Sequence, residues 1–151
     1  MTKVDFYILP ADSIEQRHLF ACRLVDKAFK LGHQIYLHTD NEAQAKALDD
    51  LLWSWRASSF IPHDIKAPLA AQQKPATIQV GYGDADQSAA EHNDLLINLT
   101  EQIPEFFSRF ERVAEIVVQI PAITDATRNS FRFYRNRGYE LESHDLRPAT
   151  Q

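Results

Sequence analysis

Cysteine is almost missing from this chain of 151 residues, and long hydrophobic runs are missing altogether. The one cysteine, Cys22, has no partner for a disulfide within the chain, which is typical of proteins from a reducing cytoplasm. No apolar run approaches the roughly 20 residues that span a membrane. The first residues also lack the apolar region and the cleavage site of a signal peptide. The sequence therefore predicts a cytoplasmic protein with no membrane contact.

Basic residues are in deficit, with 16 Lys and Arg against 21 Asp and Glu and a net charge of -5. This balance argues against broad nucleic-acid coating, because phosphate neutralisation needs Lys and Arg in excess over a surface. It leaves room for a local basic patch. The remaining composition, 44% hydrophobic and 25% charged, is ordinary for a globular protein. We expect one domain over residues 1–151.

Glycine is scarce as well, and the loops that cradle phosphates are missing. The segment after the first predicted strand, "PADSIEQ", contains no glycine, and no Walker-type G-x-x-x-x-G-K-[ST] motif occurs. The glycine-rich piece "VGYGDAD" (80–86) offers Asp84 and Asp86, which would suit a divalent metal beside a substrate phosphate. We favour a polar turn there, because Gly and Asp supply the backbone angles of turns.

Recognisable catalytic motifs are also missing. The six histidines show no H-x-x-x-H spacing, and there is no second cysteine for a zinc pair. No serine lies in a G-x-S-x-G elbow. Cys22 lies next to the apolar stripe of the first predicted helix and is interpreted as a core residue. The sequence thus predicts no catalytic residue, no metal and no cofactor, and it favours a binding protein.

The hydrophobic pattern predicts an α/β protein. A strand at 3–9 leads into a helix that starts in a capping box near residues 12–16 and stops at Gly32. A strand at 34–39 and a helix at 42–53 follow, which is the order of a βαβ unit with a largely parallel sheet. Pro62, Pro68 and Pro75 make 54–75 a loop-rich crossover. The later elements are strands at 76–82, 92–100 and 112–120, a short helix near 103–110, a helix from Pro121 to Gly138 and a strand at 139–144.

The last predicted helix carries the segment "RNSFRFYRNRG", with four arginines and three aromatics in residues 128–138. At about 100° per residue, Arg128, Arg132 and Arg135 share one narrow face. Phe131 falls between this face and the predicted core stripe, which consists of Ile123, Thr127 and Tyr134. Arg137 lies off this face, in the last turn, where a cation suits the helix dipole.

Two interpretations of this arginine face remain open. A solvated charged face is usual on surface helices. However, residues 126–139 contain no acid, and an unbalanced basic stripe beside an aromatic suits a ligand that is anionic and partly apolar. Single-stranded nucleic acid would stack a base on the aromatic. A short acidic peptide with a hydrophobic end would place its carboxylates on the arginines, and a single helix favours this smaller ligand.

A second unusual stretch, "LDDLLWSWRASSFIPHDI" (48–65), places Trp53, Trp55 and Phe60 within eight residues. One tryptophan would dock the second helix on the sheet. Aromatic anchors also dominate protein–protein interfaces. A core role and an interface role are equally favoured for these aromatic residues. For Phe60 we favour the interface role, because its neighbours Ser58 and Ser59 are polar.

With these two stretches the chain resembles the chi subunit of the bacterial DNA polymerase III holoenzyme, a component of the clamp-loader assembly. The likeness covers essentially the whole chain: an opening "FYIL" strand, "LDDLLWSWRASSFIPH", the "DLLINL" strand and "RNSFRFYRNRGYEL". The tryptophan followed by "SFIPH" is its most specific part. The resemblance implies a Rossmann-like fold without nucleotide binding, which agrees with the missing phosphate loop.

The resemblance also implies a non-catalytic adaptor. Chi proteins form a heterodimer with the psi subunit, which ties them to the clamp loader, and they bind the acidic, phenylalanine-ended tail of single-stranded DNA-binding protein. The resemblance implies that Arg128, Phe131 and Arg132 belong to the tail site, extended by Arg135, with the terminal phenylalanine in a slot beside Phe131.

Two further points follow from the resemblance. Trp53 and Phe60 match an aromatic loop that contributes partner contacts in the family. The family motif has another basic residue where this chain has Thr124, so affinity or tail orientation is expected to differ. Contact with DNA itself would be weak or indirect. A direct single-stranded nucleic-acid binder, and a small metal-dependent enzyme using Asp84 and Asp86, are the alternatives.

Overall fold

The computed structural model describes residues 2–55, 63–65, 78–83 and 94–148. Strands and helices alternate along the chain, as the sequence predicted. In order they are β1 (Lys3–Ile8), α1 (Ile14–Lys30), β2 (Ile35–Thr39), α2 (Glu42–Trp55), β3 (His63–Ile65), β4 (Ile78–Tyr82), β5 (Leu95–Asn98), the 3-10 helix η1 (Glu105–Arg109), β6 (Arg112–Val117), α4 (Pro121–Asn136) and β7 (Glu140–Asp145).

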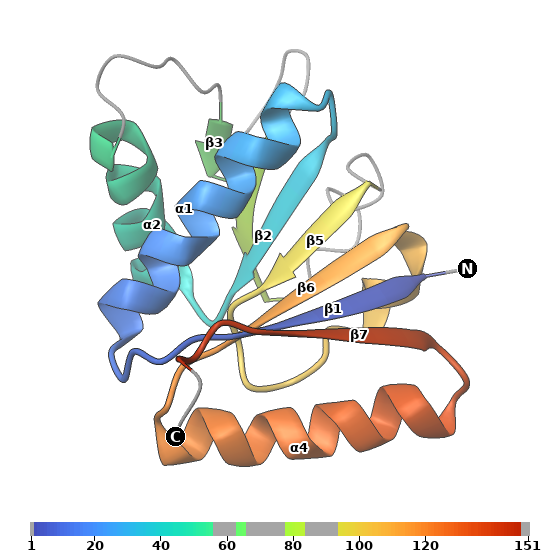
Figure 1. Cartoon of the computed structure of the whole chain (residues 1–151). Helices are drawn as coiled ribbons and strands as arrows, with labels where there is room; N and C mark the ends of the chain where they lie inside the picture. Colours follow the sequence, from blue (N-terminus) through green and yellow to red (C-terminus); the bar gives the residue numbers. More distant parts are fainter. Residues whose placement is uncertain (1, 56–62, 66–77, 84–93, 149–151) are drawn as a thin grey trace.

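One sheet of seven strands organises the described residues, in the order β3-β4-β2-β5-β6-β1-β7 (Figure 1). Every neighbouring pair is parallel. The first strand lies between the last two, so that Lys3 is opposite both Arg112 on β6 and Glu140 on β7. A parallel sheet with helices on its faces confirms the α/β, Rossmann-like prediction.

The prediction of a loop-rich crossover at 54–75 did not include two elements that the structure shows, the last residues of α2, which ends at Trp55, and the strand β3. Residues His63–Ile65 form β3, which has three residues and, among the described strands, pairs only with β4. A strand this short cannot show the alternation that identifies strands in a sequence. As an edge strand it also tolerates prolines nearby, because only one of its sides needs backbone hydrogen bonds.

Helices cover the two faces of the sheet. Successive strand residues point to opposite faces, and neighbouring residues of β1 contact different helices. The ring of Tyr7 lies 5.3 Å from that of Phe20 on α1, whereas the ring of Phe6 lies 6.1 Å from that of Tyr134 on α4. Helix α2 packs against α1 and against β2, β3 and β4. Therefore α4 lies on the face opposite α1 (Figure 1).

Local capping sets where the helices begin. The Ser13 hydroxyl accepts a hydrogen bond from the Gln16 amide at 3.1 Å, and the Asn41 side chain accepts one from the Gln44 amide at 2.9 Å. Ser13 thus caps the start of α1, within the predicted region of residues 12–16, and Asn41 caps the start of α2. Pro121 occupies the first turn of α4, where its missing N–H would have had no partner within the helix.

Glycines end α1 and α4. Gly32 and Gly138 follow the last residues of these helices with φ values of 84° and 82°, which L-residues with side chains rarely adopt. The chain can therefore turn sharply into β2 and β7. These two stops were predicted from the sequence and are confirmed.

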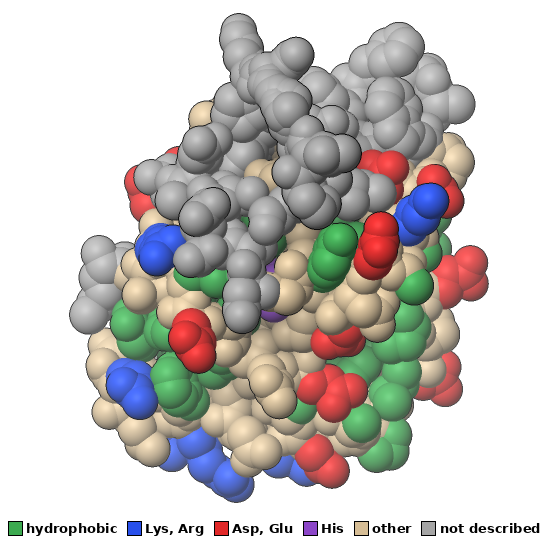
Figure 2. Space-filling view, turned by 180° about the vertical axis from the view of Figure 1, so that it is seen from behind, with side chains coloured by type: hydrophobic (Ala, Val, Ile, Leu, Met, Phe, Trp, Pro, Cys, Tyr) green, Lys and Arg blue, Asp and Glu red, His purple; other side chains and the backbone are tan. Residues whose placement is uncertain are grey.

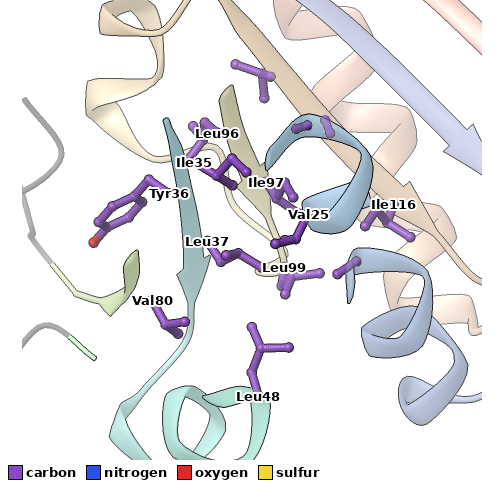
Figure 3. Packing of buried hydrophobic residues seen from close by; sticks show 14 of the residues in the cluster. Val25, Ile35, Tyr36, Leu37, Leu48, Val80, Leu96, Ile97, Leu99 and Ile116 are labelled. Carbon is purple, nitrogen blue, oxygen red and sulfur yellow. The ribbon is translucent and has the colours of Figure 1, made fainter. Parts of the chain in front are cut away.

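The core between the sheet and α1 and α2 is aliphatic. Val25, Leu37, Leu48 and Val80 are fully buried and meet in this layer (Figure 3). Cys22 is also fully buried, which confirms its prediction as a core residue. Among the described residues no helix has the length and apolarity needed to cross a membrane.

Candidate functional site

Helix α4 turns one stripe toward the sheet. Ile123, Ser130 and Tyr134 are its buried residues. Thr127, predicted as part of this stripe, is only half-buried and donates from its hydroxyl to the Ile123 carbonyl at 2.8 Å. Ser130 is buried instead, on the other side of Ile123 and Tyr134 from Thr127 at about 100° per residue, so the buried stripe is displaced slightly away from Thr127. The rotation of the helix otherwise agrees with the prediction.

The opposite face of α4 presents Arg128, Arg132 and Arg135, and all three are exposed. Lys and Arg side chains gather along the lower border of Figure 2, at the level of α4 in Figure 1. We call these three residues the arginine face. It is cationic because α4 contains a single acidic residue, Asp125.

The three guanidinium groups have different partners. Arg128 Nη1 lies 2.9 Å from Asp125 Oδ1, and their side chains are 68% and 69% exposed. Arg132 contacts the Asn129 side-chain oxygen at 3.4 Å. In the part of the chain that the structure describes, neither Arg132 nor Arg135 has an ion-pair partner. The arginine face therefore has one neutralised cation and two available ones.

Phe131 joins the arginine face to the core. Its half-buried ring lies 5.5 Å from the ring of Phe6 on β1. The Arg135 guanidinium carbon lies 5.7 Å from the Phe131 ring centroid. An anionic group and an apolar group of one ligand can thus be accommodated within one helical turn.

The other flank of α4 carries an aromatic cluster that the sequence did not single out. The Arg137 guanidinium carbon lies 4.3 Å from the Phe133 ring centroid. Phe107 on η1 contacts the rings of Phe133 at 5.9 Å and Tyr139 at 5.2 Å. This cluster fixes the C-terminal end of α4 against η1.

A buried carboxylate lies beneath α4. Glu115 on β6 is 6% exposed and accepts hydrogen bonds from the Tyr134 hydroxyl at 2.8 Å and from the Asn98 amide at 3.2 Å. Burial raises the pKa of Glu115 to about 7, and the two hydrogen bonds oppose that rise. The sequence signal for this residue is a single acid inside the apolar run "RVAEIVVQI".

The buried cation that interacts electrostatically with Glu115 is Arg17. It is 4% exposed and donates from Nε to the Ile116 carbonyl at 2.9 Å and from Nη1 to the Leu99 carbonyl at 3.3 Å. Burial lowers the pKa of Arg17, and the attraction of Glu115 opposes that effect. Arg17 thereby satisfies carbonyl groups at the carboxyl ends of two strands. The signal in the sequence was an arginine at the spacing of the apolar stripe of α1.

The carboxyl ends of β2 and β5 border a cleft of about 930 Å³. The chain leaves these neighbouring strands toward opposite faces, which is where doubly wound sheets bind ligands. Here the lining includes the carboxylates of Asp40, Glu101 and Glu105. Burial, and next the charge of Glu101, raise the pKa of Asp40. The lining also includes Arg109, but its acids outnumber this cation, so the cleft is a poor match for phosphate.

Asp5, Glu142 and His144 form a cluster whose potential ligand atoms lie within 4.8 Å of one another. His144 Nε2 is 3.1 Å from Asp5 Oδ1, while Arg112 donates to Asp5 Oδ2 at 2.8 Å. Lys3 Nζ lies 2.8 Å from Glu142. The two carboxylates are thus already balanced by cations, and the cluster is an ion-pair network that joins β1, β6 and β7. Sequence reasoning missed it because Asp5 meets Glu142 and His144 only through the pairing of β1 with β7.

The structure does not describe several of the predicted site residues. Phe60, Asp84 and Asp86 are outside the described residues. Trp53 belongs to α2, but its side chain is not among those described. The interface and turn predictions for these residues therefore stay predictions.

Comparison with known proteins gives consistent matches. The family model "DNA polymerase III chi subunit, HolC" matches residues 1–142. The DNA polymerase III subunit chi of Pseudomonas aeruginosa is 47% identical over 146 residues, which cover 97% of this chain and 98% of the relative. The proteins of the same name from Haemophilus influenzae and Escherichia coli are 27% identical over 142 residues and 24% identical over 147 residues. These matches cover 94% and 95% of this chain and 96% and 97% of the relatives.

Proposed function

This chain belongs to the DNA polymerase III chi subunit family, and from that membership we propose that it is a non-catalytic adaptor of the replicative holoenzyme. Its role is to link the clamp loader, through the psi subunit, to the acidic C-terminal tail of single-stranded DNA-binding protein. In this proposal the protein acts in DNA replication, in the cytoplasm.

The observation that carries the tail assignment is the arginine face beside Phe131. An acidic tail that ends in phenylalanine needs guanidinium groups for its carboxylates and an apolar surface for its last ring. Arg128, Arg132 and Arg135 are exposed, and Phe131 is half-buried within one turn of them. In our proposal the terminal ring lies beside Phe131, and the carboxylates contact the arginines.

The exposure of the arginines suggests a tether that exchanges readily. Ion pairs in contact with water contribute roughly 0–1 kcal/mol each, and salt at 0.15 M screens charges beyond about 8 Å. Several such contacts give a moderate affinity that falls with ionic strength. Such an affinity suits an adaptor that must release its partner as replication proceeds.

We propose that Trp53 and Phe60 form a partner interface, for which the psi subunit is the candidate that the experiment tests. The support is the family membership together with the number of aromatic residues in this stretch, since buried aromatic anchors dominate interfaces. Replacing Phe60 by Ala should weaken the heterodimer and leave tail binding intact. This separation would distinguish the two interfaces.

The deciding experiment is calorimetric titration with a synthetic acidic peptide that ends in phenylalanine, at low and moderate salt. Arg128→Ala should weaken binding about fivefold, the equivalent of about 1 kcal/mol. Arg23→Ala removes an exposed arginine from α1, on the other side of the sheet, and should leave binding unchanged. No peptide binding at low salt, together with binding of a single-stranded oligonucleotide, would overturn the proposal in favour of a nucleic-acid site.

A further inference from the structure

The acid in α4 lies where it interferes with the arginine face. Asp125 Oδ1 is 2.9 Å from Arg128 Nη1, three residues along the helix. Arg132 and Arg135 have no such partner among the described residues. Resting on the proposed tail site, we propose that Asp125 is an internal competitor that occupies Arg128 in the free protein and limits the affinity for an acidic ligand.

The competition follows from the chemistry of the pair. The Asp125 carboxylate offers Arg128 the same group that an acidic peptide would bring. Because it is held on the same helix, it is always present, so an incoming carboxylate must displace it or share the guanidinium. Even when it is displaced, its negative charge stays beside the bound acid. Both effects oppose binding.

The ion pair between Asp125 and Arg128 is nevertheless weak enough for a ligand to break it. Its side chains are about two-thirds exposed, at 68% and 69%. Exposed pairs at i,i+3 spacing contribute only a few tenths of a kcal/mol to helix stability, so a ligand with several carboxylates can break this one. Asp125 therefore weakens the tail complex without abolishing it. This arrangement favours rapid exchange over tight attachment.

The opposite role for Asp125 is also chemically possible and gives a clear contrast. If the carboxylate oriented Arg128 for the ligand, its removal would lower the affinity. The structure favours competition because the contact uses one guanidinium nitrogen, Nη1, between two exposed side chains. A buttress would hold the guanidinium from a buried position, whereas Asp125 lies as far in solvent as the group it contacts.

The test is calorimetry with the same acidic peptide on the full chain and on Asp125→Asn. At low salt the variant should bind about fivefold more tightly, because a like charge within several Å of a bound carboxylate costs on the order of 1 kcal/mol at an intermediate dielectric. The gain should fade at high salt as the charges are screened. Unchanged or weaker binding by Asp125→Asn would overturn the proposal.

Two further variants separate this inference from the tail site itself. Glu42→Gln removes an exposed acid near the start of α2 and matches the change in net charge away from α4. If Glu42→Gln tightens binding equally, the effect is one of net charge and the proposal fails. In an Arg128→Ala background, Asp125→Asn should gain clearly less than in the parent, because the competition acts through Arg128. If Arg128→Ala alone has no effect, the proposed tail site fails; if only Asp125→Asn is without effect, the tail site stands.

Discussion

Replacing Glu115 by Gln should remove a pH dependence from the stability of this protein. Glu115 is buried beneath α4, and its pKa rises from an ordinary 4.5 to about 7 because burial disfavours the charged form. The folded state therefore binds a proton between these pH values, whereas the unfolded state has lost it. The resulting stabilisation is present at low pH and is lost as the pH rises through about 7.

The size of the effect follows from the shift. One pKa unit corresponds to about 1.4 kcal/mol, so a rise from 4.5 to about 7 amounts to about 3 kcal/mol in total. Because the unfolded carboxyl is already partly ionised at pH 5, roughly 2 to 3 kcal/mol of this should be lost between pH 5 and pH 8. Other groups titrate in both proteins, so the difference between the two proteins isolates Glu115.

Urea unfolding at several pH values between 5 and 8 measures this difference. The free energy of unfolding of the parent should fall relative to that of Glu115→Gln as the pH rises. Tyr134→Phe removes a hydrogen bond that favours the charged carboxylate, and it should move the parent transition to higher pH. Parallel profiles for the parent and Glu115→Gln would refute the argument, because the carboxyl would then have the same pKa in both states.

Two other perturbations test the core. Gly81→Ala should destabilise the protein by roughly 1–3 kcal/mol, because a Cβ there would overlap the buried Tyr36 side chain; a melting temperature equal to that of the parent would contradict this packing. Burial raises the pKa of Cys22 to about 12, so a thiol reagent at pH 8 should label the native protein very slowly and the urea-unfolded protein rapidly; fast native labelling would show that the side chain is accessible.

Much of the fold was predictable because its elements carry local signals. A start of α1 near residues 12–16 and its stop at Gly32 are predictable from residue types alone, whereas the choice of Ser13 as the cap comes from the structure. The 3-10 helix η1, Glu105–Arg109, was predicted as a short helix. The strand β3 was missed because a three-residue edge strand has too few positions for a pattern. The order of the strands in the sheet could not be predicted either, because parallel pairing joins residues that are distant along the chain.

The arginine face was predictable for a related reason. All its residues belong to one helix, and helical rotation places them without knowledge of the rest of the fold. The pair between Asp125 and Arg128 was not predicted, because Asp125 lies one residue before the acid-free segment 126–139. The contact of Glu115 with Tyr134 depends on how α4 docks on β6, and no local pattern specifies that docking.

The position of β1 has a consequence for the newly made chain. Residues Lys3–Ile8 pair only with β6 and β7, and Lys3 is opposite Arg112 and Glu140. At roughly 5–20 residues per second, a ribosome takes on the order of 5–20 s to synthesise the intervening hundred residues. During that time the first strand has no partner in the sheet, although it is mostly apolar. Strand β1 thus waits for partners that are made about a hundred residues later, and the folding rate should be set by that long-range closure.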